Sequence, residues 1–169
     1  MLIMGKLDLR LAGLQAYANK IKNSNYVTKV GFFEDATYAD NTKVAYVAYL
    51  NEFGQHNPPR PFMHKTLEKQ LNKWTKLYGY VLKSQGVNPS SIRKACEQMG
   101  ETAKGDIVKT IKAWNPADPR YNKPATIRAK MRKTNAHKGG KNQAGNDPYR
   151  VLHDTGVMID SVTYEVERV

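Results

Sequence analysis

The triplet Asp154-Thr155-Gly156 has the residue types of the catalytic loop of aspartic proteases. In those enzymes two such loops face each other, so that two carboxylates share one proton. Here the triplet occurs once, and a homodimer would have to supply the second carboxylate. An aspartate or threonine before a helix commonly accepts a hydrogen bond from the helix N-terminus. We therefore interpret Asp154, Thr155 and Gly156 as a structural helix cap, with an aspartic-type hydrolase built on Asp154 as the alternative.

The remaining residues that could carry chemistry lack the spacing of a metal or nucleophile site. The chain has four histidines, at His56, His64, His137 and His153. None forms an i, i+4 pair, and one cysteine, Cys96, excludes both an intrachain disulfide and a thiolate-rich zinc site. Gly139-Gly140-Lys141 lacks the glycine spacing of a phosphate-binding loop. We expect no catalytic residues, no metal and no cofactor, so the protein is predicted not to be an enzyme.

Positive charge is concentrated in one segment. The formal net charge is +12, and residues 120–150 hold nine Lys and Arg against one Asp. The residues predicted to contact DNA or an acidic partner are Arg128, Lys130, Arg132, Lys133, Lys138 and Lys141. Such a segment either follows a phosphate backbone or is an arm that orders on another subunit. We favour the arm, because base-stacking aromatics are limited to Tyr121 and Tyr149.

Hydrophobic periodicity predicts an α+β domain over 1–169, with a small antiparallel or mixed sheet packed with three or four helices. The expected helices are one from Leu7 that ends before Asn23, Lys43–Phe53, a long helix from Pro61 to Gly86, another from Ser90 to Trp114, and a short turn after Gly156. Each long helix has an apolar stripe that is expected to be buried: Met63, Leu67, Leu71, Trp74, Tyr78 and Val81 on the first, and Ile92, Cys96, Met99, Ala103, Ile107, Ile111 and Trp114 on the second. The expected strands are Tyr26–Phe33 and Val162–Val166, and the second is expected to be half-exposed because Val162, Tyr164 and Val166 alternate with polar residues. Residues 115–150 are expected to be an extended basic loop with a short turn at most over Thr126–Lys133.

The helix over Lys43–Phe53 is apolar around much of its surface, so more than one of its faces must be covered by protein. We expect Asp40, Asn41 or Thr42 to cap its start and Gly54 to end it. A proline-stiffened turn follows, and such a segment loses little entropy when it docks. The residues predicted to contact a subunit or partner are Tyr46, Tyr49, Phe53, Pro59, Arg60, Pro61 and Phe62.

Neither a membrane span nor a secretory leader is expected. The longest uncharged apolar run, Val44–Leu50, is far shorter than the ~20 residues that cross a bilayer. Lys6, Asp8 and Arg10 interrupt the apolar stretch that a signal peptide needs. These features favour an aqueous, reducing compartment.

Several short motifs, taken in order, resemble one protein family. The first set is Val30-Gly31-Phe32-Phe33, Tyr38-Ala39 and Val44-Ala45. The order continues with Asn51-Glu52-Phe53-Gly54, Pro59-Arg60-Pro61-Phe62-Met63, Leu152-His153-Asp154-Thr155-Gly156-Val157-Met158 and Ser161-Val162. This order, over residues 25–166, is similar to the tail-completion or virion-morphogenesis proteins of tailed phages, the Mu-like morphogenesis group. The chain departs from the family in its basic loop and in Tyr149-Arg150-Val151-Leu152, which replaces the usual proline-leucine lead-in.

The resemblance implies a virion structural protein that acts in head–tail joining. It would form a homo-oligomeric ring, six-fold by preference or twelve-fold, between the portal or connector and the tail. Its partners would be the connector, tail terminator and tail tube proteins, with packaged DNA as a further candidate. It would be assembled in the host cytoplasm and reside in the neck or tail of the virion. The alternative is a DNA-binding protein acting through residues 120–150.

Overall fold

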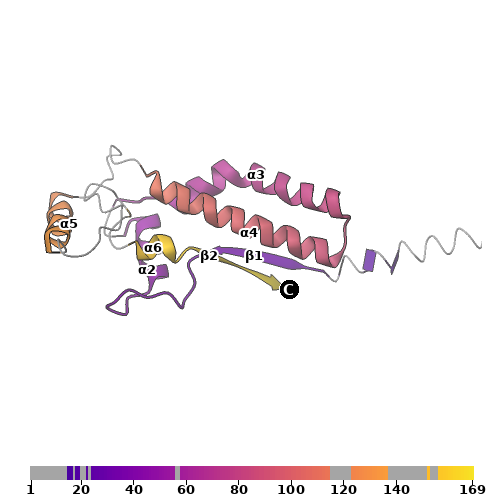
Figure 1. The fold of residues 1–169 in the computed structure, drawn as a ribbon, viewed down its shortest axis with the longest axis horizontal. Coiled ribbons are helices and arrows are strands. Elements are labelled where there is room, and N and C mark those ends of the chain that lie inside the picture. The colour runs from indigo at the N-terminus through magenta and orange to yellow at the C-terminus, as the bar shows by residue number, and fades with distance from the viewer. Residues whose placement is uncertain are drawn as a thin grey trace, which may run out of the picture. The chain divides into compact units, whose positions relative to one another are not determined.

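A computed structural model describes residues 15–16, 18–19, 22, 24–55, 58–114, 123–136, 152 and 156–169 of the chain. Its elements are β1 (Tyr26–Gly31), α2 (Val44–Phe53), α3 (Phe62–Gln85), α4 (Pro89–Lys112), α5 (Pro124–Ala136), α6 (Val157–Asp160) and β2 (Thr163–Arg168) (Figure 1). β1 and β2 form a two-stranded antiparallel sheet, and the helices complete an α+β fold, which confirms the predicted class.

The chain divides into two compact units. One consists of Met1–Lys29, Asn72–Thr102 and Tyr164–Val169, and the other of Val30–Leu71 and Ala103–Thr163. Each unit therefore contains one part of α3 and one part of α4.

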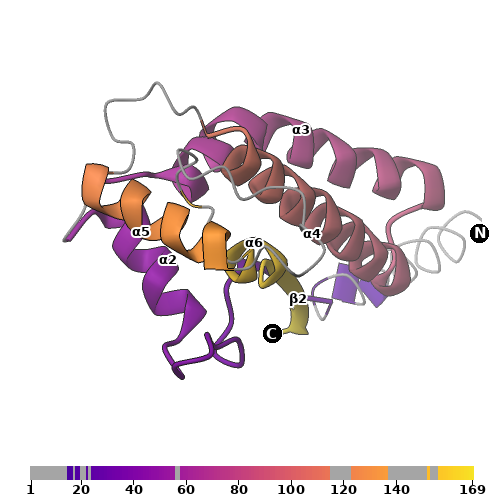
Figure 2. The same cartoon turned by 60° about the vertical axis from the view of Figure 1, so that its left-hand side comes forward.

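In the first unit, the second half of α3 and the first half of α4 run side by side as a helical hairpin (Figures 1 and 2). Gly86 ends α3 with φ 72°, as the sequence predicts. Asn88 and Ser91 cap the start of α4 reciprocally, because each backbone N–H donates to the other's side-chain oxygen, at 3.0 and 2.9 Å. Trp74, Val81, Ile92 and Cys96 are buried in this unit, as expected for the apolar stripes of the two helices.

The strand residues of the first unit pack on α4. The Thr28 hydroxyl donates to the Cys96 carbonyl over 3.3 Å, and the Tyr164 ring occupies the space where a side chain on Gly100 would begin. Across the strands, Lys29 Nζ lies 2.7 Å from Glu167 Oε2, and this hydrogen bond raises the pKa of Lys29. The predicted alternation of the last strand is confirmed, since Tyr164 and Val166 are half-buried between exposed neighbours.

The second unit holds the larger hydrophobic core. Its buried residues are Val44, Ala48, Phe62, Ile107, Ile111, Trp114, Met158, Ile159 and Val162. Phe32 meets Phe62 edge to face with ring centroids 6.0 Å apart, and α2 packs against α6. Lys65 Nζ lies 4.4 Å from the centre of the Trp114 ring, a cation–π distance. Two residues of the stripe predicted for α3, Leu67 and Leu71, are exposed instead, because Phe62 and Thr66 occupy the core-facing positions of that half-helix.

The start of α2 differs from the prediction. Lys43 is the N-cap residue and makes no side-chain capping bond, so the expected cap by Asp40, Asn41 or Thr42 is wrong. Asp40 Oδ1 instead accepts the Thr42 N–H at 3.0 Å, which lowers the pKa of the Asp40 carboxyl. The other end is confirmed, since Gly54 is left-handed and its N–H donates to the Leu50 carbonyl at 2.9 Å.

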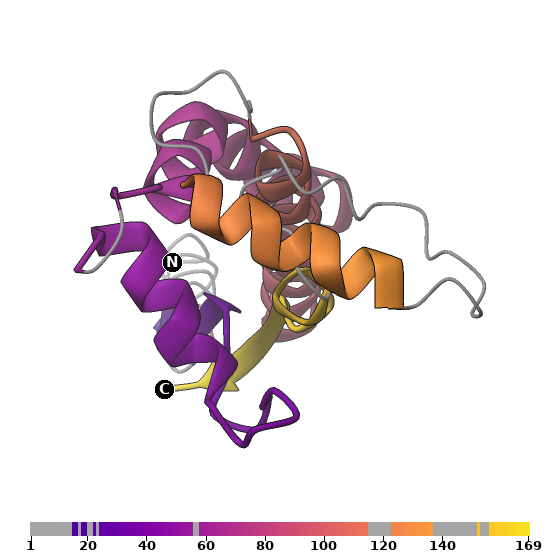
Figure 3. The same cartoon turned by 90° about the vertical axis from the view of Figure 1, so that its left-hand side faces the viewer.

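The predicted basic loop contains a helix. α5 spans 13 residues where at most a short turn was expected (Figure 3). Pro124 at its first position and alanine, arginine, lysine and methionine after it favour helix, but few apolar residues are present to reveal a period. The rest of the expected loop, 115–122 and 137–150, lies outside the described residues. Of the expected N-terminal helix, Gln15, Ala16, Ala18, Asn19 and Lys22 are described, and they are helical.

Candidate interaction surface

Three aromatic side chains of α2 are exposed on one side of the helix. Tyr46, Tyr49 and Phe53 are 55%, 47% and 64% exposed. They occupy positions i, i+3 and i+7, whereas Val44 and Ala48 occupy the buried face. The Tyr49 and Phe53 rings lie 4.8 Å apart between centroids, tilted by 47°. We call these three residues the aromatic stripe.

The aromatic stripe carries no charge of its own. The only ionisable group of α2 besides the tyrosines is Glu52, and its carboxylate is engaged elsewhere. Its two oxygens accept the backbone N–H groups of Met63 and His64, at 2.9 and 3.0 Å. These are two of the N–H groups that a helix leaves without an intrahelical partner at its start, so Glu52 caps α3 from α2.

Asn51 and Arg60 form a second connection between α2 and the start of α3. The Arg60 guanidinium donates to Asn51 Oδ1 at 2.9 Å, and the Arg60 N–H donates to the Asn51 carbonyl at 2.7 Å. The Asn51 side-chain amide in turn donates to the Val47 carbonyl at 2.9 Å. Together with the left-handed Gly54, these bonds fix the corner between the two helices, and we call Asn51, Glu52, Gly54 and Arg60 the α2–α3 corner.

Two of the predicted partner contacts belong to the fold rather than to a surface. Phe62 is fully buried in the core of the second unit, and Arg60 is 6% exposed and bonded to Asn51. The prediction that these two side chains contact a partner is therefore wrong for the folded chain. Pro59 is exposed and Pro61 partly so, and both flank Arg60 in the corner. Sequence reasoning missed the roles of Asn51 and Glu52, although an acidic residue two positions before a helix-ending glycine was a visible signal.

The predicted basic contacts lie in α5 or beyond the described residues. Arg128 and Arg132 are exposed and one turn apart on α5. Lys130 and Lys133 belong to the same helix, but their side chains are not among those described. Lys138 and Lys141 lie outside the described residues. The structure thus gathers four of the six predicted residues in one 13-residue helix.

The predicted helix cap is described only at its last residue. Gly156 is the N-cap of α6 with φ 83°, a conformation that favours glycine. Asp154 and Thr155 lie outside the described residues. Elsewhere in the described chain, no group of three or more His, Cys, Asp or Glu is arranged to hold a metal ion. Among those same residues, no helix has the length and apolarity that a membrane crossing requires.

Comparisons with known proteins return nothing similar. No family model, no curated protein and no solved structure matches the chain.

Proposed function

We propose that this protein is a structural subunit of a tailed-phage virion, which assembles with copies of itself into a ring at the neck or tail end. The observation that carries the proposal is the aromatic stripe of α2. The class of particle comes from the order of sequence motifs that resembles tail-completion and morphogenesis proteins.

The aromatic stripe supports self-assembly for a physical reason. Tyrosine and phenylalanine bury a large apolar area with few rotatable bonds, and aromatic residues dominate the energetics of interfaces. In one copy, Tyr46, Tyr49 and Phe53 leave this area in water. Docking on a neighbour removes this surface from water, which stabilises the complex by roughly 25 cal/mol for each Å² of apolar surface buried.

A second copy of the chain is the occupant we propose. The net charge of +12 repels another copy at long range, so an uncharged surface is favoured for a contact between copies. The aromatic stripe meets that requirement, since it contains no ionised side chain. Head-to-tail contacts between copies close into a ring when their rotation permits.

The α2–α3 corner supports the same use. An interface is stronger when its residues are held in place before binding, because less conformational entropy is lost. Phe53 directly follows Glu52, whose carboxylate is bonded to two backbone N–H groups of α3. The end of the aromatic stripe is therefore fixed to the fold before any partner arrives.

Assembly is tested by measuring the mass of the purified full chain by sedimentation velocity and native mass spectrometry. We expect a discrete oligomer of the 19.1 kDa chain, with six copies preferred over twelve. The triple variant Tyr46→Ser/Tyr49→Ser/Phe53→Ser is expected to be monomeric, with an unchanged circular dichroism spectrum.

Tyr80→Ser is the matched control, because Tyr80 is a 70% exposed aromatic residue on α3 outside the aromatic stripe. It should retain the oligomer. A wild-type chain that stays monomeric up to the highest soluble concentration, alone and with tail tube or connector proteins, would contradict the proposal. Equal loss of assembly in Tyr80→Ser would show that the aromatic stripe has no special role.

A further inference from the structure

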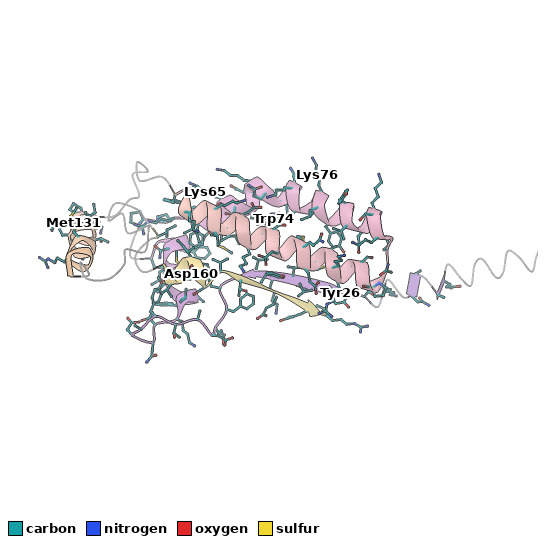
Figure 4. All side chains as sticks on the ribbon, viewed as in Figure 1. Tyr26, Lys65, Trp74, Lys76, Met131 and Asp160 are labelled. Carbon is teal, nitrogen blue, oxygen red and sulfur yellow. The ribbon has the colours of Figure 1, made fainter. Side chains whose placement is uncertain are left out.

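α5 is a cationic helix whose described side chains are almost all exposed. Its sequence from Pro124 to Ala136 contains four Lys and Arg and no Asp or Glu. Every described side chain in it is exposed except Ile127, which is partly so. Met131, labelled in Figure 4, is among the exposed ones.

Although its residue types favour helix, a helix of this length and charge is only weakly stable on its own. An isolated helix shorter than about 12–15 residues is marginal in water. Arg128 and Arg132 are four residues apart, and like charges at that spacing repel rather than support the helix. Acidic side chains that would pair with them within α5 are absent from its sequence. A polyanion that neutralises these charges would therefore stabilise the helix as well as bind it.

We propose that α5 binds the phosphate backbone of double-stranded DNA without reading its sequence. The Cα atoms of Arg128 and Arg132 are four residues apart, about 6 Å along the helix axis. Duplex DNA carries one negative charge per about 1.7 Å of its axis, so several phosphates lie within the reach of these two long side chains. Arginine also binds phosphate in a bidentate manner, which lysine does not.

The composition of α5 selects duplex DNA over other anionic surfaces. Single strands are held by bases stacked on aromatic side chains, and α5 contains no aromatic residue. A helix that lies in a membrane interface needs a broad apolar face, and Ile127 and Met131 are the only large apolar residues in α5. An acidic protein presents scattered carboxylates rather than a regular row of charges. This inference is independent of the ring proposed above, because a monomer presents the same helix.

The test compares two variants that lose the same charge at different places. Arg128→Gln/Arg132→Gln removes two positive charges from α5, and glutamine keeps the helix propensity. Lys76→Gln/Lys83→Gln removes two positive charges from exposed positions of α3. Lys76 points away from α4 (Figure 4). Binding of the full chain to a fluorescent DNA duplex of random sequence is measured by anisotropy between about 50 and 200 mM NaCl.

We expect wild-type binding to weaken steeply with salt. The α5 variant should lose affinity, and its slope of log K against log salt should fall in magnitude by about 1.8, because each lost phosphate contact removes about 0.9. The α3 variant should change the slope much less.

Three results would overturn the inference. The first is a wild-type chain that does not bind the duplex at the lowest salt. The second is an equal loss of slope in the two variants, which would assign binding to overall charge. The third is equally strong binding of anionic lipid vesicles or polyglutamate, lost in the α5 variant, which would make α5 a site for a different polyanion.

Discussion

At the scale of single residues, Glu52 is the clearest case of a side chain that holds two elements together. It belongs to α2, yet both of its carboxylate oxygens accept N–H groups at the start of α3. The helix dipole adds a favourable interaction with the negative charge. Sequence reasoning treats Asn51-Glu52-Phe53-Gly54 as one motif, whereas the structure separates it into corner residues and one exposed aromatic residue.

Glu52→Ala is expected to destabilise the protein by about 1–2 kcal/mol, because two N–H groups at the start of α3 lose their acceptor. Glu68→Ala is the control, since Glu68 is an exposed glutamate of α3 and its ion pair with His64 lies in solvent. It should change stability by less than about 0.5 kcal/mol. Urea unfolding followed by circular dichroism measures both. Equal effects would mean that Glu52 does not cap α3.

At the scale of elements, α4 contains two glycines that the same substitution should affect in opposite directions. A Cβ at Gly100 would lie 2.8 Å from Tyr164 Cγ and 3.0 Å from Thr28 Cγ2. A Cβ at Gly105 would meet nothing within 4 Å. One glycine is therefore required by packing, and the other only weakens the helix.

Gly100→Ala is expected to lower stability by about 1–3 kcal/mol, because the strands must move away from α4. Gly105→Ala is expected to raise stability by up to about 1 kcal/mol, since alanine is the better helix former. Thermal and urea unfolding of the two variants measure whether each substitution raises or lowers stability. A stabilised Gly100→Ala would show that the strands do not pack closely on this residue.

The elements differ in how far their sequences predict them. α3 and α4 have long apolar stripes and clear glycine or proline boundaries, and both were predicted within a few residues. The core of α4 was predicted in detail, from Ile92 to Trp114. α5 was not predicted, because periodicity detects a buried face and the described side chains of this helix are almost all exposed.

Of the candidate interaction surface, the sequence predicts the exposed aromatic residues of α2 but not the residues of the α2–α3 corner. The apolar excess of α2 predicts more apolar surface than one buried face can hold, and Tyr46, Tyr49 and Phe53 are exposed, while their contact with a partner stays a prediction. Arg60 and Phe62 were misassigned because residue type does not distinguish a docking segment from a corner. The bonds of Arg60 to Asn51 and the burial of Phe62 depend on where α2 ends relative to α3, which no short motif specifies.

At the scale of the whole molecule, the net charge of +12 acts in opposite directions on the two proposed interactions. Copies of the chain repel one another, and salt screens that repulsion. DNA, which is negatively charged, attracts the chain, and salt weakens that attraction.

Raising NaCl from about 50 to about 500 mM should therefore strengthen self-association while it weakens DNA binding. Sedimentation velocity of the protein alone and anisotropy with the duplex, in the same buffers, measure the two effects. Assembly that weakens with salt would indicate an interface built on ion pairs rather than on the aromatic stripe.

The α2–α3 corner has a practical consequence for genetics, because it puts neighbouring codons under different kinds of selection. Changes at codon 52 should reduce the yield of intact polypeptide, whatever the assay of the particle. If the protein has the proposed role in a virion, changes at codon 53 should leave yield untouched and reduce only the number of finished particles. A deep mutational scan that records both yield and particle count would thus find an abrupt boundary between two adjacent positions.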